Sequence, residues 1–234
     1  MLAAYGITDI GRKRRENQDS FRIDLEGGFF AVADGMGGMR NGALASRYAV
    51  DVLNELIIRK IISEVDIEEI SSIIKDAIIE LNDLVRSAIG KNSGTTIVMV
   101  LLEGDWAFFA HMGDSRAYLY RDGELSRLTE DHNLFALLKK TKKFTEEELK
   151  KDKTHHMLVR YVGMENPRPD VRAFPIKPGD KFLLCTDGLS EMVKDEELAE
   201  AMRAALGPEA ILQRLVANAN EAGGYDNITA IIVE

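Results

Sequence analysis

Three aspartates stand at the ends of apolar, strand-like runs, and their chemistry is the best lead that the sequence offers. Asp34 and Asp187 each end such a run and are each followed directly by glycine, whereas Asp226 precedes the last apolar run, residues 229–233. Magnesium and manganese prefer carboxylate, carbonyl and water oxygens, while zinc prefers His and Cys. We therefore expect these carboxylates, far apart in the sequence, to converge on one site for hard divalent cations.

The pair Asp34-Gly35 has a second interpretation, because Asp-Gly is also the commonest signal of a two-residue β-hairpin. The chain contains its own comparison in Asp122-Gly123, which has alternating, strand-like residues on both sides. Asp34-Gly35 lacks that alternation and is followed by further glycines, which allow the backbone to approach a ligand closely. We interpret Asp34 as a ligand and Asp122 as a turn residue.

Two further motifs could serve the same site. Residues 11–19 contain four consecutive basic residues, and an arginine among them could grip a phosphate through two parallel N–H donors. The remaining basic residues, Arg12, Lys13 and Arg15, are interpreted as solvated. Asp114 stands at a break between strands and is, by itself, a turn former. We therefore expect one phosphate ligand from the basic run. Asp114 is interpreted either as a turn residue or as a metal ligand.

The composition is that of a globular chain and argues against several classes of protein. Its 234 residues and 45% hydrophobic content predict one domain, residues 1–234. Because no apolar run approaches ~18 residues and the start lacks signal-peptide features, we expect a cytoplasmic protein without membrane contact. The net charge of -9 argues against nucleic acid as a partner. Cys185 lies in an apolar, strand-like run and is interpreted as a core residue. It is not expected to be a cysteine-phosphatase nucleophile, because Glu191 stands where such a loop needs arginine.

The periodicity of apolar residues predicts an order of strands and helices. Strands are expected at residues 1–9 and 20–25, helices at 42–62 and 67–89, and strands again across 93–129, interpreted as one antiparallel meander. A strand around Cys185, a helix from about Asp195, a helix between Pro208 and about Ala222 and a last strand follow. The economical packing is an α+β four-layer sandwich, with two antiparallel sheets face to face and a pair of antiparallel helices outside each.

Residues 130–169 interrupt the pattern of short links and are expected to form a variable flap. They contain a short helix from Asn133, a Lys-rich stretch and a second helix opened by Thr145. Long insertions often cover a binding site, although a solvated helical excursion explains this segment equally well. The three histidines of the segment, His132, His155 and His156, are expected to be exposed.

Seven motifs in order give the chain a resemblance to the protein phosphatase 2C family, the metal-dependent serine/threonine phosphatases, in its prokaryotic branch. Each motif is weak alone, but together they cover almost the whole chain. They are Gly11, Arg14, Asn17 and Asp19, then residues 34–38, 94–96, 113–116, 128–132, 185–189 and 226–229.

The resemblance implies a set of site residues. The ligands of a metal pair would be Asp34, which bridges the two ions, the Gly35 carbonyl, Asp19, Asp187 and Asp226. A third ion would use Asp114 and Asp187, and Arg14 would hold the phosphate, so that Arg14, Asp34 and Asp187 carry catalysis. Gln18, Asn227 and His132 would lie around the site or at the flap.

Two positions depart from the pattern of the family. Gln18 stands where many members have Glu, so one carboxylate is an amide here, which bears on metal binding. Met36 stands where members of eukaryotic type carry a histidine that is proposed to protonate the leaving group. Either a metal-bound water or His132 must then deliver that proton, and we favour water.

The expected reaction is the hydrolysis of phosphoserine or phosphothreonine on proteins by a water that bridges two Mn²⁺ or Mg²⁺ ions. The expected partners are phosphorylated proteins and a cognate kinase system, and a monomer is expected. One alternative is a metal-dependent phosphodiesterase or nucleotide hydrolase that uses the same aspartates. Another is a non-catalytic module that binds phosphoproteins, although the intact Asp34, Asp187 and Asp226 argue against it.

Overall fold

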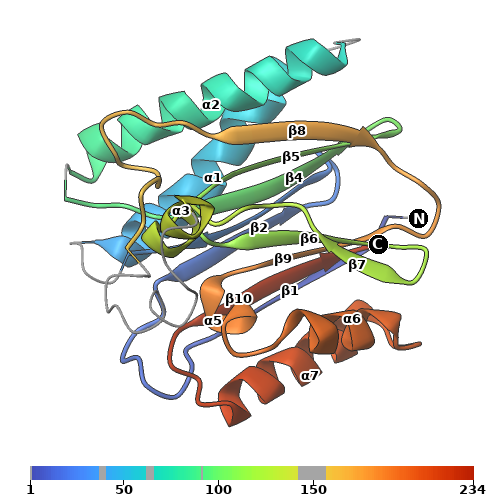
Figure 1. The fold of residues 1–234 in the computed structure, drawn as a ribbon. Coiled ribbons are helices and arrows are strands. Elements are labelled where there is room, and N and C mark those ends of the chain that lie inside the picture. Colours follow the sequence, from blue (N-terminus) through green and yellow to red (C-terminus); the bar gives the residue numbers. More distant parts are fainter. Residues whose placement is uncertain (1, 37–40, 62–65, 91, 142–156) are drawn as a thin grey trace.

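Two antiparallel five-stranded sheets pack face to face in the computed structural model, which describes residues 2–36, 41–61, 66–90, 92–141 and 157–234 (Figure 1). In spatial order, the first sheet contains β2 (Asp19–Asp24), β3 (Phe29–Asp34), β4 (Ile97–Glu103), β5 (Trp106–Met112) and β8 (Asp170–Pro175). The second sheet contains β1 (Ala4–Asp9), β10 (Ile228–Val233), β9 (Lys181–Cys185), β6 (Arg116–Arg121) and β7 (Glu124–Arg127).

The continuous apolar run of β3 is explained by burial on both of its faces. Phe30 and Val32 pack in the core between the two sheets, and Phe29, Ala31 and Ala33 pack in the core beneath the helices. A strand that is covered on both sides has no solvent-facing positions and so shows no polar alternation. Asp34 is therefore held at the end of a strand that is buried on both faces.

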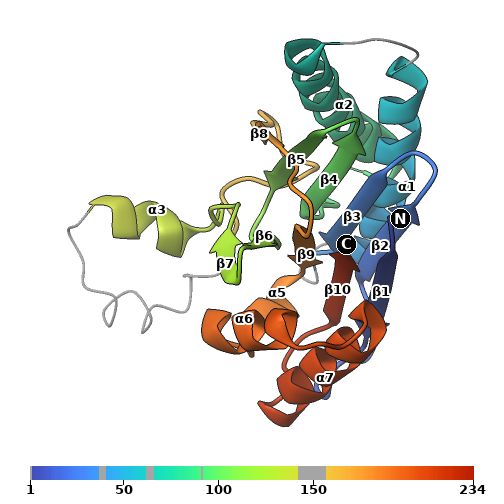
Figure 2. The same cartoon turned by 90° about the vertical axis from the view of Figure 1, so that its right-hand side faces the viewer.

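Pairs of helices cover the outer face of each sheet, which confirms the predicted four-layer α+β sandwich (Figure 2). The first sheet is covered by α1 (Gly42–Lys60) and α2 (Ile67–Ala88), and the second by α6 (Asp195–Arg203) and α7 (Pro208–Glu221). The short helix α5 (Asp187–Ser190) follows β9 directly. None of the helices in the described ranges has the length and apolar character of a membrane span.

The expected meander over residues 93–129 is wrong, because its strands divide between the two sheets. The hairpin of β4 and β5 belongs to the first sheet, and the hairpin of β6 and β7 belongs to the second. The chain crosses between the sheets at residues 113–115, where Gly113 has a φ of 122° and a Cβ would lie 2.6 Å from Thr96 Cβ. Alternation of polar and apolar residues identifies a strand but does not say which sheet it joins.

The edge strand β8 was not predicted from the sequence. Its partly buried residues Val171 and Ala173 pack on the core of the first sheet and alternate with the exposed Arg172. That alternation is the signal that could have identified it, but the strand is short and ends at Pro175. The flap helix expected from Asn133 is confirmed as α3 (Leu134–Thr141), and Figure 2 shows it standing apart from the four layers. The helix expected from Thr145 lies outside the described residues, as do His155 and His156.

Candidate metal centre and active site

Four of the predicted acidic residues line one cleft of about 650 Å³, and they reach it from both sheets. Asp34 ends β3 of the first sheet, and Asp187 begins α5 directly after β9 of the second. Asp226 lies just before β10, and Asp114 lies in the crossing between the sheets. The structure thus places Asp34, Asp187 and Asp226 around one cleft together with Asp114, and their role as metal ligands stays a prediction.

The Gly94-Thr95-Thr96 segment fixes the backbone around Asp34. Thr96 Oγ1 accepts a hydrogen bond from the Asp34 N–H at 2.9 Å, and Thr95 Oγ1 donates to the Asp34 carbonyl at 2.8 Å. Thr96 Oγ1 also lies 2.7 Å from the Ser115 hydroxyl, beside Asp114. Two buried threonines thus join the end of β3 to the crossing segment and hold two of the acidic residues in a fixed relation.

Glycine is required at positions 35 and 188 because there is no space for a side chain. A Cβ on Gly35 would lie 2.3 Å from the Gly42 carbonyl oxygen, and a Cβ on Gly188 would lie 2.0 Å from the Asn227 carbonyl oxygen. Both contacts are with backbone, which cannot rotate away. The Asp-Gly pairs at these two sites therefore serve close packing, whereas Asp122-Gly123 forms the predicted hairpin with left-handed φ values of 54° and 87°.

Asp19 lies behind Asp34 and links the two sheets. It stands opposite Asp34 in the pairing of β2 with β3, and its Oδ2 accepts a hydrogen bond from the Thr186 hydroxyl at 2.8 Å. Its Oδ1 and the Oδ1 of Asp187 are buried, and neither has a hydrogen-bond partner in the described part of the chain. Buried carboxylate oxygens with unused lone pairs are what a cation would complete.

The electrostatics of the cluster indicate the same ligand. Burial raises the pKa of Asp19 to about 7 and that of Asp187 to about 6. The pKa of Asp34 lies well above its ordinary range, first because of burial and then because of repulsion from Asp19 and Asp187. Carboxylates this close to one another are stabilised in their charged form by positive charge. The donors are oxygen atoms, so the residues fit Mg²⁺ or Mn²⁺ better than Zn²⁺.

Arg14 stands at the rim as the one basic residue among the described residues that line the cleft. Its Nη2 lies 2.5 Å from Asp226 Oδ2, and 46% of its side chain is exposed. Asn227 holds the segment that carries Arg14: its amide donates to the carbonyls of Ile10 and Glu16 at 2.9 and 3.0 Å and accepts from the Gln18 N–H at 2.9 Å. Arg14 is thus partly solvated and ready to contact a ligand in the cleft.

Comparison with known proteins supplies the assignment. The family model of protein phosphatase 2C matches residues 11–223. The chain belongs to the protein phosphatase 2C family. It is 33% identical to the serine/threonine phosphatase Stp of Listeria monocytogenes over 97% of this chain and 93% of that protein.

Solved structures of protein phosphatase 2C enzymes have the same fold. The serine/threonine phosphatase of S. agalactiae superposes with a TM-score of 0.87 at 32% identity, covering 100% of this chain and 99% of the other. The catalytic domain of PstP, solved in complex with two manganese ions, gives a TM-score of 0.81 at 30% identity over 100% and 97% of the two chains.

The two departures from the protein phosphatase 2C pattern have structural counterparts. The Gln18 amide donates a hydrogen bond to the Glu16 carboxylate, a contact that a second carboxylate at this position would turn into repulsion. Met36 lines the cleft and has no titratable group. Arg12, Lys13 and Arg15 are exposed, as expected for solvated residues.

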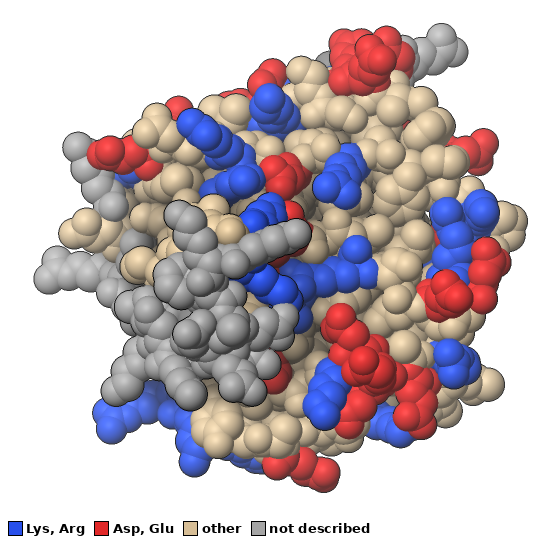
Figure 3. Space-filling model, in the orientation of Figure 1, with Lys and Arg blue, Asp and Glu red and all other residues tan. Residues whose placement is uncertain are grey.

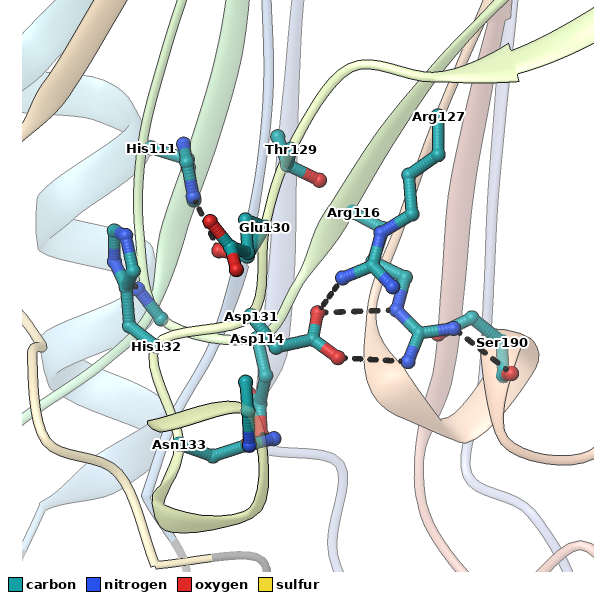
Figure 4. Close-up of polar contacts among 12 residues, drawn as sticks. His111, Asp114, Arg116, Arg127, Thr129, Glu130, Asp131, His132, Asn133 and Ser190 are labelled. Carbon is teal, nitrogen blue, oxygen red and sulfur yellow. Dashed lines mark hydrogen bonds and ion pairs between the residues drawn. The ribbon is translucent and has the colours of Figure 1, made fainter. Parts of the chain in front are cut away.

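The expectation that His132 is exposed is wrong. Its side chain is 5% exposed, and its Nδ1 accepts a hydrogen bond from the Gly113 N–H at 3.3 Å. Nε2 therefore carries the hydrogen and donates it to Asp170 Oδ2 at 3.1 Å (Figure 4 shows the ring beside His111). Burial lowers the pKa of His132, its ring stacks on His111 at 4.3 Å, and it is not among the described residues that line the cleft. Its partner lies 38 residues away in β8, so no local signal could reveal its burial.

Replacing His132 by Ala is expected to destabilise the fold and to leave catalysis largely intact. The variant loses two hydrogen bonds and a buried ring, which costs about 2 kcal/mol or more of unfolding free energy. The kcat values for an aryl phosphate and for a phosphothreonine peptide should each fall by less than about tenfold, below the usual contribution of a general acid. Thermal unfolding and steady-state kinetics measure both effects. A large loss that is confined to the peptide, together with loss of the basic limb of its pH–rate profile, would make His132 the acid instead.

Asp114 and Asn133 form a contact that sequence reasoning did not identify. Asp114 is 6% exposed, and the Asn133 amide donates to its Oδ2 at 3.4 Å while Asn133 Oδ1 caps α3 by accepting from the Ala136 N–H at 3.0 Å. Burial raises the pKa of Asp114 well above its ordinary range. The helix α3 therefore begins next to a residue that contacts one of the acidic groups of the cleft.

Proposed function

We propose that this chain hydrolyses phosphoserine and phosphothreonine on proteins and that the reaction requires divalent cations. The observation that carries the proposal is the convergence of Asp34, Asp114, Asp187 and Asp226 on one cleft with Arg14 at its rim, in a chain of the protein phosphatase 2C family. The relatives that this chain resembles over nearly all of its length are named serine/threonine phosphatases. An acidic cleft without added cations would repel a phosphate dianion, so the cations are part of the proposal.

Two cations would be held by Asp34, Asp187, Asp226 and Asp19 with the Gly35 carbonyl, and we propose a third at Asp114 and Asp187. Manganese is supported by the two manganese ions in the related PstP domain, and magnesium uses the same donors. When bound, such cations lower the pKa of water and neutralise the charge of the phosphoryl group. Asp34 and Asp19 come from one sheet and Asp187 and Asp226 from the other, so the packed sheets fix the spacing of the donors.

The side chains of the cleft have separate tasks in this reaction. Arg14 orients the phosphate, and it can do so while sharing its guanidinium with Asp226 because five N–H donors are available. Neither Met36 nor the buried His132 can protonate the departing serine or threonine oxygen. We propose that water supplies that proton.

Replacing Arg14 by Ala is expected mainly to raise KM for phosphate esters. The loss in kcat/KM should correspond to about 1.5 kcal/mol, the lower end for a hydrogen bond to a charged group, because the Arg14 side chain is 46% exposed. Steady-state kinetics with an aryl phosphate measure the change, and Arg15→Ala is the matched control. If Arg15→Ala raises KM and Arg14→Ala does not, the phosphate ligand is Arg15.

The proposal extends to the domain organisation, the oligomeric state and the cellular setting of the protein. We propose that residues 1–234 form one catalytic domain, with residues 130–169 as a flap beside the cleft. We also propose a monomer that acts in the cytoplasm against a cognate serine/threonine kinase. The physical support for the flap is the contact between Asn133 and Asp114, which joins the start of α3 to the cleft.

Hydrolysis assays separate this proposal from its alternatives. The purified chain should hydrolyse an aryl phosphate and a phosphothreonine peptide with manganese or magnesium, and an excess of chelator should stop both reactions. A nucleotide and a bis-aryl phosphodiester, offered in the same assay, should be poor substrates. Full activity after exhaustive chelation would exclude the metal mechanism, faster hydrolysis of the diester or nucleotide would favour the alternative enzyme class, and binding without turnover would favour a phosphoprotein-binding module.

A further inference from the structure

A second groove, with a volume of about 920 Å³, adjoins the cleft that holds the acidic cluster. Its walls are α3 on one side and the ends of β6, β7 and α5 on the other. Glu191, which follows α5, lines both the groove and the cleft, so the two hollows meet at this residue. A peptide whose phosphorylated residue enters the cleft would therefore extend past Glu191 into this groove.

Among the charged residues that line the two hollows, acidic ones are in excess in the cleft and basic ones in the groove. Among the described residues, five acidic ones and one basic one line the cleft, whereas four basic ones, Arg116, Arg127, Lys139 and Lys140, and three acidic ones line the groove. The whole chain carries a net charge of -9, so a basic groove is a local exception. Figure 3 shows Lys and Arg side chains gathered over this part of the surface.

The floor of the groove is a fixed network in which one carboxylate serves two guanidinium groups. Arg116 donates to both oxygens of Asp131, at 3.1 and 2.8 Å, and also to the Ser190 carbonyl at 3.3 Å. Arg127 pairs with the same Asp131 carboxylate, as Figure 4 shows. Asp131 compensates one of these two positive charges, and Glu191 also lies near Arg116, so the positive excess of the groove is the balance of four basic against three acidic residues in its described lining.

The wall formed by α3 adds two positively charged side chains, Lys139 and Lys140, and the ion pair of Lys140 is exposed to solvent. Lys139 Nζ lies 6.0 Å from the centre of the Phe135 ring, which offers an apolar surface beside the charge. Lys140 pairs with Glu130 at 2.9 Å, but both side chains are more than half exposed, and such exposed pairs are weak and easily exchanged. A carboxylate brought by a ligand can therefore replace that partner at little cost.

We propose that this groove binds an acidic segment of the phosphoprotein substrate, next to the phosphorylated residue in the cleft. The inference rests on the proposed function and adds the class of substrate that the site selects. Attraction of acidic side chains by Lys139, Lys140 and Arg127 would favour substrates with Asp, Glu or a second phosphate on the side of the chain that passes Glu191. Basic segments would be excluded by the same charges.

Kinetics with matched phosphothreonine peptides test the proposal. Four peptides of equal length carry acidic residues before the phosphothreonine, acidic residues after it, neutral residues on both sides, or basic residues on both sides. With saturating manganese, one of the two acidic peptides should have the lowest KM, and its advantage should shrink as sodium chloride is added. The double variant Lys139→Glu/Lys140→Glu should raise that KM about tenfold, because two attractions each become repulsions. Its kinetics with an aryl phosphate should stay unchanged.

A charge-matched control is available on the far helix layer. Arg59 and Lys75 are exposed on α1 and α2, and Arg59→Glu/Lys75→Glu changes the net charge of the protein equally. This control should leave all four KM values in their original order. Binding of a fluorescent acidic phosphopeptide, followed by anisotropy, should weaken in the groove variant and not in the control, and it tests the groove even where turnover is absent.

The outcomes distinguish the groove from the reaction. Hydrolysis of the neutral peptide with no acidic preference, or with a preference that the groove variant retains, would overturn the groove and leave the proposed function standing. Failure to hydrolyse the aryl phosphate and every peptide would overturn the proposed function. If the groove variant also bound the acidic phosphopeptide as tightly as the wild type in the anisotropy assay, the proposal that the groove binds an acidic segment would be overturned too.

Discussion

Asp34→Asn is expected to lower kcat with manganese by about 10³-fold or more while making the metal-free protein more stable. The loss of turnover should exceed the 10- to 100-fold that removal of an outer partner of a metal ligand typically causes, because Asp34 lies at the centre of the acidic cluster. The gain in stability follows from the same position. Burial and repulsion from Asp19 and Asp187 raise the pKa of Asp34, and an amide removes that repulsion.

Opposite changes in activity and stability make this prediction specific. Replacing a residue with a purely structural role would lower both turnover and stability. Replacing a cation ligand that is surrounded by other carboxylates should lower turnover without lowering the stability of the metal-free protein. The measurements are aryl phosphate hydrolysis with manganese and thermal unfolding in excess chelator. Asp51→Asn, on the partly exposed face of α1, is a matched control in which neither quantity should change much. Near wild-type turnover in Asp34→Asn would place the reaction elsewhere.

The second large effect concerns the metal-free protein, whose stability should fall as the pH rises from about 4 to about 7. The pKa of Asp187 is about 6 and that of Asp19 about 7 in the folded chain, raised by burial above the value near 3.8 that an unfolded chain has. Between these values the folded protein retains protons that the unfolded chain has lost, so each increase in pH favours unfolding. Asp19 and Asp187 titrate as interacting neighbours, so the loss belongs to the cluster as a whole.

Divalent cations should reverse this pH dependence. Manganese binds the deprotonated carboxylates, so its stabilisation of the fold should grow over the same pH range in which the metal-free protein weakens. Chemical denaturation at several pH values, with chelator and with manganese, gives both curves. Asp19→Asn should flatten the metal-free curve. A metal-free stability that rises steadily from pH 4 to pH 7 would contradict the arrangement described for the cluster.

Elements with strong local signals could be predicted from the sequence. Asp66 caps α2 by accepting from the Glu69 N–H at 2.8 Å, and the apolar stripe of that helix lies in the core. Asp122-Gly123 makes the expected turn, and Cys185 is buried in β9. Each of these outcomes depends on residues within a few positions of one another, where propensity and capping decide the structure.

Features that depend on distant partners could not be predicted. The choice of sheet for the β6–β7 hairpin depends on the pairing of β6 with β9, about 65 residues further along the chain. The burial of His132 depends on Asp170, and the binding of the residues 10–18 segment depends on Asn227. The convergence of Asp34, Asp187 and Asp226 is an exception. Each aspartate stands next to an apolar strand, so its position could be expected from the position of that strand at the edge of a sheet.

The origin of the acidic cluster in two separate sheets has a consequence for the order of events in folding. Asp19 and Asp34 belong to one sheet and Asp187 and Asp226 border the other, so the full set of donors exists only after the sheets have docked. Either sheet alone would hold a cation weakly. Manganese should therefore act chiefly on the fully docked state, slowing the rate of unfolding while leaving the rate of folding nearly unchanged. Bound cations would then join the two sheets directly, and their removal by a chelator would speed unfolding.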